Sequence, residues 1–184
     1  MIKLFLITGS SGVGKSTIVP LLKESLSDDF EIHDFDEKLT KEVVMNVRLL
    51  DDWRIETIKY WIDVARENLK LNKSTIVIGL IYPSEVGQLD VQIPYYFCLL
   101  DVSNEKIQER LMGKRFSSPE KIVGLKEATD QTPEEFISEN KYLMERLRNE
   151  IKVVNGEIVD TTEDTPEQTA NKILSWISHV KASP

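Results

Sequence analysis

Residues 6–18 read LITGSSGVGKSTI, and this stretch decides how the rest of the chain is interpreted. Gly9 to Ser16 match the full pattern G-x-x-x-x-G-K-[ST]. The apolar residues 2–8 before it predict a buried strand, and residues 15–27 after it predict a helix. In this context the loop is expected to bind phosphate, because its backbone N–H groups and the positive end of the helix converge on one anion.

The positions of this loop predict separate contacts to a nucleoside triphosphate. Its glycines allow backbone angles that a Cβ atom would oppose. Lys15 should reach the β and γ phosphate oxygens, and the Ser16 hydroxyl should bind Mg²⁺. We therefore expect ATP as a co-substrate and Mg²⁺ as a cofactor, although the loop alone does not distinguish ATP from GTP. The predicted nucleotide-binding residues are Gly9, Ser10, Ser11, Gly12, Val13, Gly14, Lys15, Ser16, Thr17 and Arg110.

Length and composition predict one domain, residues 1–184, with enough apolar residues (41%) for a sizeable core. The formal net charge of -8 argues against nucleic acid or a membrane surface as a partner, since both attract basic proteins. The sequence contains no run of 18 apolar residues, so no membrane-spanning helix is predicted. The single cysteine, Cys98, excludes a disulfide framework and fits a cytoplasmic location. The oligomeric state stays open.

Strands and helices are expected to alternate along the chain. This order predicts an α/β fold, a three-layer α/β/α sandwich with a five-stranded parallel sheet. The polar residues 113–132 are predicted to form a mobile lid, and the helical residues 38–71 to bind the acceptor. Beyond the first strand and helix, the expected strands are 30–36, 74–81, 95–102 and 156–162, and the expected helices are 39–50, 53–71, 103–115, 133–151 and 165–180.

Two acids close the second predicted strand. Asp34 and Asp36 point the same way if that strand continues through them, and the crevice beside the phosphate loop is then within reach. One carboxylate could serve the hydration shell of Mg²⁺, and the other could accept a proton from an attacking hydroxyl. The alternative is that Asp36 only caps the next helix and that Asp34 is solvated. The third strand ends in Gly79 with no acid, so this pair is the expected source of the metal-side carboxylate.

Gly79 could allow the backbone to lie against a bound substrate, although a bulge or tight packing explains a strand glycine equally well. Basic residues near the predicted lid, Arg110, Lys114 and Arg115, could neutralise the charge that develops during phosphoryl transfer. Ordinary surface charge is the alternative for each of them. The sequence leaves open whether Arg110 or Arg115 is the lid arginine.

The order of GSSGVGKS (9–16), DFD (34–36) and IVDTTEDTPEQTANKI (158–173) resembles the shikimate/gluconate-kinase type of P-loop small-molecule kinases, which are related to nucleoside-monophosphate kinases. The resemblance implies a P-loop NTPase fold of the nucleotide-kinase kind. It implies that Asp34 is linked to the metal, that Asp36 grips the acceptor hydroxyl and that Arg115 is the lid arginine.

In the same family an arginine that precedes the third strand holds the substrate carboxylate, and Arg54 in WRIE stands in a comparable place. The sequence departs from the family in three respects. The glycine run that closes the third strand is reduced to Gly79, the region ENKYLMERLRN (139–149) has no clear match to a later substrate arginine, and the histidine-containing lid of gluconate kinases is absent. The resemblance therefore implies the reaction type but not the substrate.

Together these observations predict an ATP-dependent phosphotransferase that moves the γ-phosphate to a small-molecule acceptor: a sugar acid, cyclic polyol, nucleoside or nucleotide. Its predicted catalytic residues are Lys15, Asp36 and Arg115, its substrate-binding residues Asp34, Asp36, Arg54 and Gly79, and its metal ligands Ser16 and Asp34. The alternatives are an ATPase or kinase that acts on RNA or protein, and a GTPase-like switch. The switch needs an Asn-Lys-x-Asp motif, which the sequence lacks.

Overall fold

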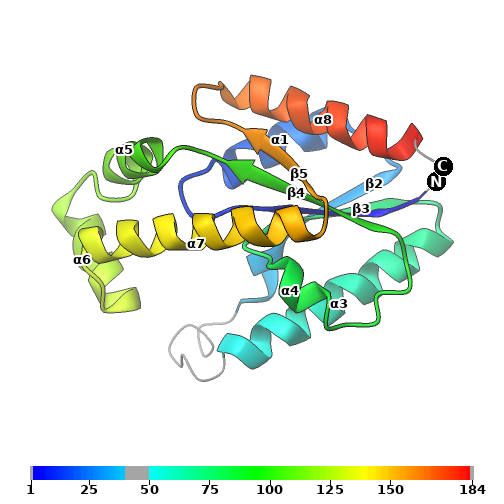
Figure 1. Ribbon diagram of the computed structural model, residues 1–184, viewed down its shortest axis with the longest axis horizontal. Coiled ribbons are helices and arrows are strands. Elements are labelled where there is room, and N and C mark those ends of the chain that lie inside the picture. The colour runs from blue at the N-terminus through cyan, green and yellow to red at the C-terminus, as the bar shows by residue number, and fades with distance from the viewer. Residues whose placement is uncertain (1, 40–49, 183–184) are drawn as a thin grey trace.

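The computed structural model describes residues 2–39 and 50–182. Its strands form one parallel five-stranded sheet in the order β2-β3-β1-β4-β5 (Figure 1). The strands are β1 (Leu4–Thr8), β2 (Phe30–Asp34), β3 (Ser74–Gly79), β4 (Tyr95–Asp101) and β5 (Glu157–Asp160). The helices are α1 (Lys15–Ser25), the 3₁₀ helix η1 (Phe35–Lys38), α3 (Leu50–Lys70), α4 (Pro83–Val86), α5 (Asn104–Lys114), α6 (Pro119–Thr129), α7 (Pro133–Val153) and α8 (Pro166–Ala182).

Helices cover both faces of the sheet. α1 and α8 pack together on one face, and α3, α4 and α7 lie on the other (Figure 1). All residues of β1 and β3 are buried, which explains their nearly continuous apolar sequences. The predicted three-layer α/β/α sandwich with five parallel strands is thus confirmed. No helix in the described part of the chain is long and apolar enough to cross a membrane.

The order of the strands places a crevice next to the phosphate loop. From the central strand β1 the chain first builds β2 and β3 on one side, and then β4 and β5 on the other. Ligands of open parallel sheets bind at the carboxyl ends of the strands, where the order reverses in this way. The loop that follows β1 therefore lies where an α/β protein most readily forms a binding site.

The second strand is shorter than predicted. β2 ends at Asp34, and the chain turns into η1 instead of continuing as a strand to Asp36. The Asp34 carboxylate accepts a hydrogen bond from the Asp36 N–H (2.9 Å), and the Glu37 carboxylate accepts one from the Asp34 N–H (2.9 Å). These local bonds compete with the sheet and begin the 3₁₀ helix. The predicted helix 39–50 falls almost wholly on residues 40–49, outside the described residues.

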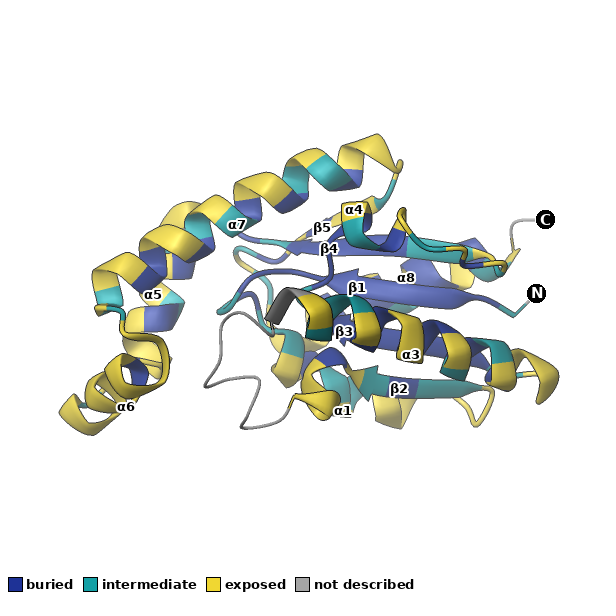
Figure 2. Cartoon of the chain, turned by 90° about the horizontal axis from the view of Figure 1, so that it is seen from below, coloured by how far each residue is buried: buried dark blue, intermediate teal, exposed yellow. Residues whose placement is uncertain are grey.

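The predicted lid, residues 113–132, contains helix α6. α5 and α6 project past the carboxyl ends of the strands, and most residues of α6 are exposed (Figure 2). Ser118 precedes α6 and Pro119 is its first residue, which is the position in a helix that proline favours. The movement of this segment as a lid remains a prediction.

Candidate active site

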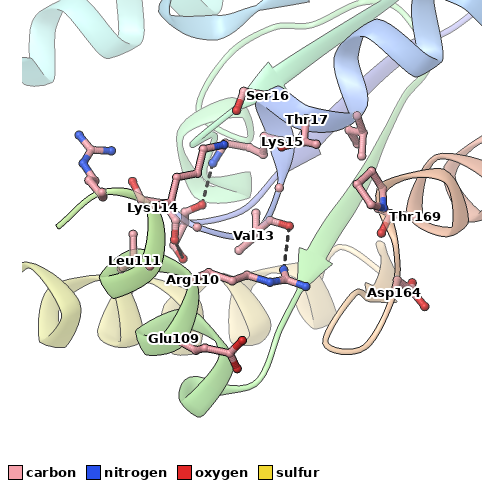
Figure 3. A pocket seen from close by; sticks show the side chains of 18 of the residues that line it. Val13, Lys15, Ser16, Thr17, Glu109, Arg110, Leu111, Lys114, Asp164 and Thr169 are labelled. Atoms are coloured by element: carbon pink, nitrogen blue, oxygen red, sulfur yellow. Dashed lines mark hydrogen bonds between the residues drawn. The ribbon is translucent and has the colours of Figure 1, made fainter. Parts of the chain in front are cut away.

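One cavity of about 1010 Å³ lies at the carboxyl ends of the strands (Figure 3). Four segments line it: residues 10–18, the carboxylates after β2, the end of α5 with Arg115 and Lys121, and the loop from β5 to α8. The structure thus brings most of the predicted site residues together. These are Ser10, Ser11, Gly12, Val13, Gly14, Lys15, Ser16, Thr17, Asp34, Asp36, Arg110 and Arg115.

The phosphate loop leaves the N-terminus of α1 open. Gly12 and Gly14 have φ angles of 88° and 104°, which L side chains rarely adopt. Gly14 caps the helix without a side-chain hydrogen bond, and no acid occupies the first turn. The backbone N–H groups of residues 12–16 donate no hydrogen bond to any described residue. Unpaired donors at a helix N-terminus favour an anion, so this end of the cavity suits a phosphate group.

Helix α7 holds the start of the phosphate loop through two hydrogen bonds. The Ser11 N–H donates to Asn140 Oδ1 (2.8 Å), and the Ser10 N–H donates to Met144 Sδ (3.4 Å). Asn140 is buried, and its Nδ2 donates to the carbonyl oxygen of Phe136 (2.8 Å). These bonds satisfy the first loop N–H groups with protein, so only the groups from residue 12 onward remain for a ligand.

Lys15 lies inside the cavity and is already hydrogen-bonded. Its Nζ donates to the carbonyl oxygens of Gly9 (2.6 Å) and Ser10 (2.8 Å). Loss of water around the ammonium lowers the pKa of Lys15 to about 8, although the carboxylates of Asp36 and Asp34 oppose this shift. Gly9 does not line the cavity; a Cβ atom there would meet Val13 Cγ2 at 2.7 Å, so its role is close packing.

Asp34 and Asp36 line the same cavity as Lys15, although η1 and not a strand positions Asp36. Partial removal from water, helped by the Asp34 charge, raises the pKa of Asp36; Lys15 and Arg54 oppose that shift. Neither carboxylate lies within ion-pair distance, 4.0 Å, of a cation among the described residues. Asp36 and the second oxygen of Asp34, whose Oδ1 caps η1, can therefore accept a hydroxyl group or bind a metal ion.

The donor set of the cavity suits Mg²⁺ that arrives with a nucleotide. The Ser16 hydroxyl and the carboxylates of Asp34 and Asp36 are the hard oxygen ligands that Mg²⁺ prefers. Among the described residues, however, no group of three or more acid, histidine or cysteine side chains could hold a metal. The protein would thus supply only part of the coordination sphere, as at sites where phosphates and water complete it.

Arg110 ties the phosphate loop to the chain after β5. Its guanidinium donates to the carbonyl oxygens of Val13 (3.4 Å) and Thr161 (2.6 Å), as Figure 3 shows for Val13. Asp164 and Thr169 border this part of the cavity (Figure 3). Arg110 therefore holds this part of the cavity wall in place through hydrogen bonds to two separate segments of the chain.

Three basic side chains line the cavity from the predicted lid: Lys114, Arg115 and Lys121. The Arg115 guanidinium carbon lies 4.8 Å from the centroid of the Phe136 ring. Lys121 Nζ donates to the Lys114 carbonyl oxygen and to Ser117 Oγ, both at 2.9 Å. Lys114 and Arg115 are exposed, and Lys121 is held only by exposed groups. All three side chains can therefore leave these contacts and bind an anion instead.

Two predicted substrate-binding residues need correction. Arg54 is not available as predicted, because Glu85 binds its guanidinium in a two-bonded ion pair with both N–O distances at 2.7 Å. Gly79 is buried and does not line the cavity; a Cβ atom there would meet Phe35 Cβ at 2.2 Å. Gly79 thus serves the packing of η1 on the sheet, the alternative that its sequence left open.

The sequence interpretation missed Lys121 and Asn140. Lys121 belongs to a polar stretch in which nothing distinguishes it from other charged residues. Asn140 did carry a signal, because it falls on the buried face of α7 between Phe136 and Met144, at helical spacing. A single amide in an apolar stripe indicates a buried hydrogen-bond partner.

The chain is similar in structure to several kinases of small molecules. A sugar kinase from a Janibacter species aligns with a TM-score of 0.66 and 19% identity over 97% of this chain and 95% of its own. Shikimate kinase from Acinetobacter baumannii, solved with shikimate, aligns with a TM-score of 0.61 and 17% identity over 100% and 96%. Thymidylate kinase from Candida albicans aligns with a TM-score of 0.63 and 14% identity over 98% and 92%.

No protein-family model matches the sequence, and no curated protein matches it either. At such low identities the structural similarity establishes the fold and not the activity. It extends over nearly the whole chain and agrees with the phosphate-loop motif and the topology of the sheet. The chain therefore has the fold of the P-loop kinases that its sequence resembles.

Proposed function

We propose that the protein is an ATP-dependent phosphotransferase that moves the γ-phosphoryl group to a hydroxyl group of a small molecule. One observation carries this proposal: a single cavity joins the open N-terminus of α1 to the carboxylates of Asp34 and Asp36, neither of which pairs with a cation of the described residues. Its volume of about 1010 Å³ is at the upper end of ordinary ligand pockets, which suits two substrates. The similar structures are also kinases of small molecules.

The triphosphate would bind across the phosphate loop. The N–H groups of residues 12–16 would donate to it, and Lys15 would exchange the carbonyl oxygens of Gly9 and Ser10 for phosphate oxygens. The base would lie toward Arg110 and the loop from β5 to α8, next to Asp164. When bound, Mg²⁺ would neutralise charge on the terminal phosphates, with Ser16 and Asp34 as its protein ligands.

Asp36 would orient the acceptor hydroxyl and take its proton. Burial and the neighbouring Asp34 charge raise its pKa, which makes its carboxylate a stronger base than an ordinary aspartate. Arg115 would neutralise the equatorial oxygens of the transferred group as the charge on them spreads, with Lys114 and Lys121 beside it. Because all three belong to the predicted lid, closure of that segment would complete the site only when both substrates are bound.

The test is ATP consumption by the purified protein, with Mg²⁺, in the presence of separate pools of nucleosides, nucleotides, sugar acids, neutral sugars and cyclic polyols. We expect one pool to raise ADP formation above the rate without acceptor, and mass spectrometry to detect a phosphorylated member of that pool. An equal rate with every pool would contradict the proposal and favour an ATPase, or a kinase acting on RNA or protein. The protein would then be assayed with those macromolecules directly.

A further inference from the structure

The exposed side chain of Arg115 lies against a buried aromatic ring of α7. Its guanidinium carbon is 4.8 Å from the centroid of the Phe136 ring, within the range of a cation–π interaction. Phe136 belongs to the first turn of α7 and is only 8% exposed. Arg115 lines the cavity and Phe136 does not, so the ring contacts a cation of the cavity wall from outside the cavity.

This contact leaves the hydrogen-bonding groups of Arg115 unused. Among the described residues, the Arg115 side chain has no hydrogen-bond or ion-pair partner. A guanidinium group can lie with its face over an aromatic ring while its N–H groups point outward in its own plane. Arg115 can therefore bind phosphate oxygens without leaving the ring.

The backbone around Arg115 is anchored to both α5 and α7. The N–H groups of Arg115 and Phe116 both donate to the carbonyl oxygen of Leu111, at 2.8 and 3.1 Å, which ties these residues to the end of α5. The Phe116 ring is buried and meets the Phe136 ring edge-on, with centroids 5.8 Å apart and an interplanar angle of 88°. Arg115 thus lies at the anchored base of the predicted lid, and a movement of the exposed helix α6 would leave it close to Phe136.

The same turn of α7 also holds the phosphate loop. The carbonyl oxygen of Phe136 accepts a hydrogen bond from Asn140 Nδ2 (2.8 Å), and Asn140 Oδ1 accepts one from the Ser11 N–H (2.8 Å). Ser11 and Arg115 line the same cavity. Phe136 is therefore linked to the loop through its backbone and to Arg115 through its ring, so a change of the ring leaves the link to the loop in place.

We infer that Phe136 is a positioning residue for phosphoryl transfer, because its ring holds the Arg115 guanidinium in the cavity wall before the substrates bind. This inference rests on the proposed phosphotransferase function, in which Arg115 neutralises the transferred group, and it adds a residue outside the cavity to that function. An arginine that is held beforehand loses less side-chain freedom when it meets the transition state. The ring thus raises the rate of transfer and has little effect on ATP affinity, since the charge that Arg115 neutralises develops only during the reaction.

The variant Phe136→Leu removes the ring and keeps an apolar side chain. The rate of phosphoryl transfer is measured in a single turnover, with the protein in excess over ATP and with the best acceptor and Mg²⁺, because product release limits kcat in many enzymes. Titration calorimetry measures ATP affinity. We expect the transfer rate to fall about fivefold, as the loss of one cation–π contact predicts, and ATP affinity to stay within about twofold of the unaltered protein.

Ile137→Val is the matched control, because Ile137 is the next residue of α7 and is also buried but has no ring to hold a cation. Its transfer rate should stay as in the unaltered protein. Phe136→Met is a second variant, whose longer apolar side chain fills more of the space of the ring, and we expect the same loss of rate from it as from Phe136→Leu. Thermal melting and ATP binding verify that each variant is folded.

A double-mutant cycle shows whether Phe136 acts through Arg115. Arg115→Met removes the charge and keeps a long side chain, and it should lower the transfer rate by at least about 10²-fold. In that background Phe136→Leu should lower the rate no further, because the contact is already lost. A residue that only maintained the fold would lower the rate by the same factor with and without Arg115.

The outcomes separate the inference from the function on which it rests. An unchanged transfer rate in folded Phe136→Leu, or the same loss in both backgrounds of the cycle, would overturn the inference and leave the phosphotransferase function standing. A faster rate would also overturn it, since the ring would then hold Arg115 away from the reaction. ADP formation that no acceptor raises, in a protein that binds ATP, would overturn the proposed function and the inference with it.

Discussion

Two regions of the molecule differ in how far the protein satisfies its own polar groups: the phosphate end of the cavity, and the region next to η1 where α3 meets α4. At the phosphate end, N–H groups of the loop and of the first turn of α1 have no partner among the described residues, and no side chain caps the helix. In the second region, whose residues named here do not line the cavity, Glu85 already holds Arg54, and Phe35 fills the space beside Gly79. The phosphate end thus offers unpaired donors to an anion. In the second region the protein supplies the anion itself, the Glu85 carboxylate.

This difference explains why the two regions could not be predicted equally well from the sequence. A loop whose ligand is a phosphate group must expose backbone donors in a fixed spacing, and that spacing is written in one continuous motif. The second region is assembled from η1, α3 and α4, which are separate segments of the chain. A residue there can be paired by a neighbour that the sequence does not point to. The predictions below test this contrast, beginning with the largest expected effect.

Lys15→Ala should have the largest effect. It removes the one loop side chain expected to follow the transferred phosphate, so we expect kcat/KM to fall at least about 10³-fold while the protein stays folded. Turnover with the best acceptor and thermal melting measure the two quantities. Lys23→Ala, an exposed lysine in the last turn of the same helix, is the control. Retained activity in Lys15→Ala would show that the phosphate site lies elsewhere.

Asp36→Asn should affect the acceptor end alone. The amide keeps the size of the side chain but cannot take a proton, so we expect kcat to fall about 10²-fold or more while ATP affinity changes little. Steady-state kinetics and direct ATP binding separate these effects. Equal losses in both would assign Asp36 to the metal site or to the fold instead.

The pH dependence of ATP binding should report on Lys15. Because burial lowers its pKa to about 8, the ammonium is fully charged well below pH 8 and loses its proton as the pH rises through that value. ATP affinity of the free protein should therefore be highest below pH 8 and fall above it, at most about tenfold per pH unit. Titration calorimetry between pH 6.5 and 9.5 measures this, and Lys15→Ala should remove the dependence.

Asn140→Leu should weaken the phosphate end from outside the cavity. It removes the acceptor of the Ser11 N–H, and a buried donor without a partner costs about 1–3 kcal/mol. We expect a lower melting temperature and ATP affinity reduced about tenfold, with little change in acceptor KM. Tyr142→Ala, an exposed position on the same helix, is the control. Normal ATP affinity in folded Asn140→Leu would show that the loop keeps its shape without α7.

Gly79→Ala should have the smallest direct effect on chemistry and act through stability. The added methyl group would overlap Phe35 Cβ, which lies 2.2 Å from its position, so we expect a loss of about 1–3 kcal/mol. Gly124→Ala in α6 is the matched control, because its methyl group would meet nothing within 4 Å and alanine favours a helix. Denaturant unfolding measures both. A Gly79→Ala protein of normal stability but altered acceptor KM would restore Gly79 as a substrate contact.

Most of the fold could be predicted from the sequence. Strands buried on both faces are continuously apolar, and the long amphipathic helices have a clear period, as Ile58, Ile62 and Ala65 in α3 illustrate. The boundaries failed where side chains compete with the backbone. Asp34 caps η1 with its own carboxylate, which ended β2 two residues before the predicted end. Such a bond depends on a local geometry that a pattern of residue types does not specify.

The sequence by itself determined the phosphate loop, the parallel α/β sandwich and the acids after the second strand, because short-range spacing and burial on both faces fix these features. Only the tertiary structure decided that Arg54 is bound to Glu85, that Gly79 makes room for Phe35 and that Asn140 supports the loop. Each of these depends on a partner between 31 and 129 residues away in the chain, and only for Asn140 does the sequence hint that a partner exists. The residue type of a charged or polar group does not show whether the group is available to a ligand or is already paired within the protein. Only the distances between residues in the folded chain show this.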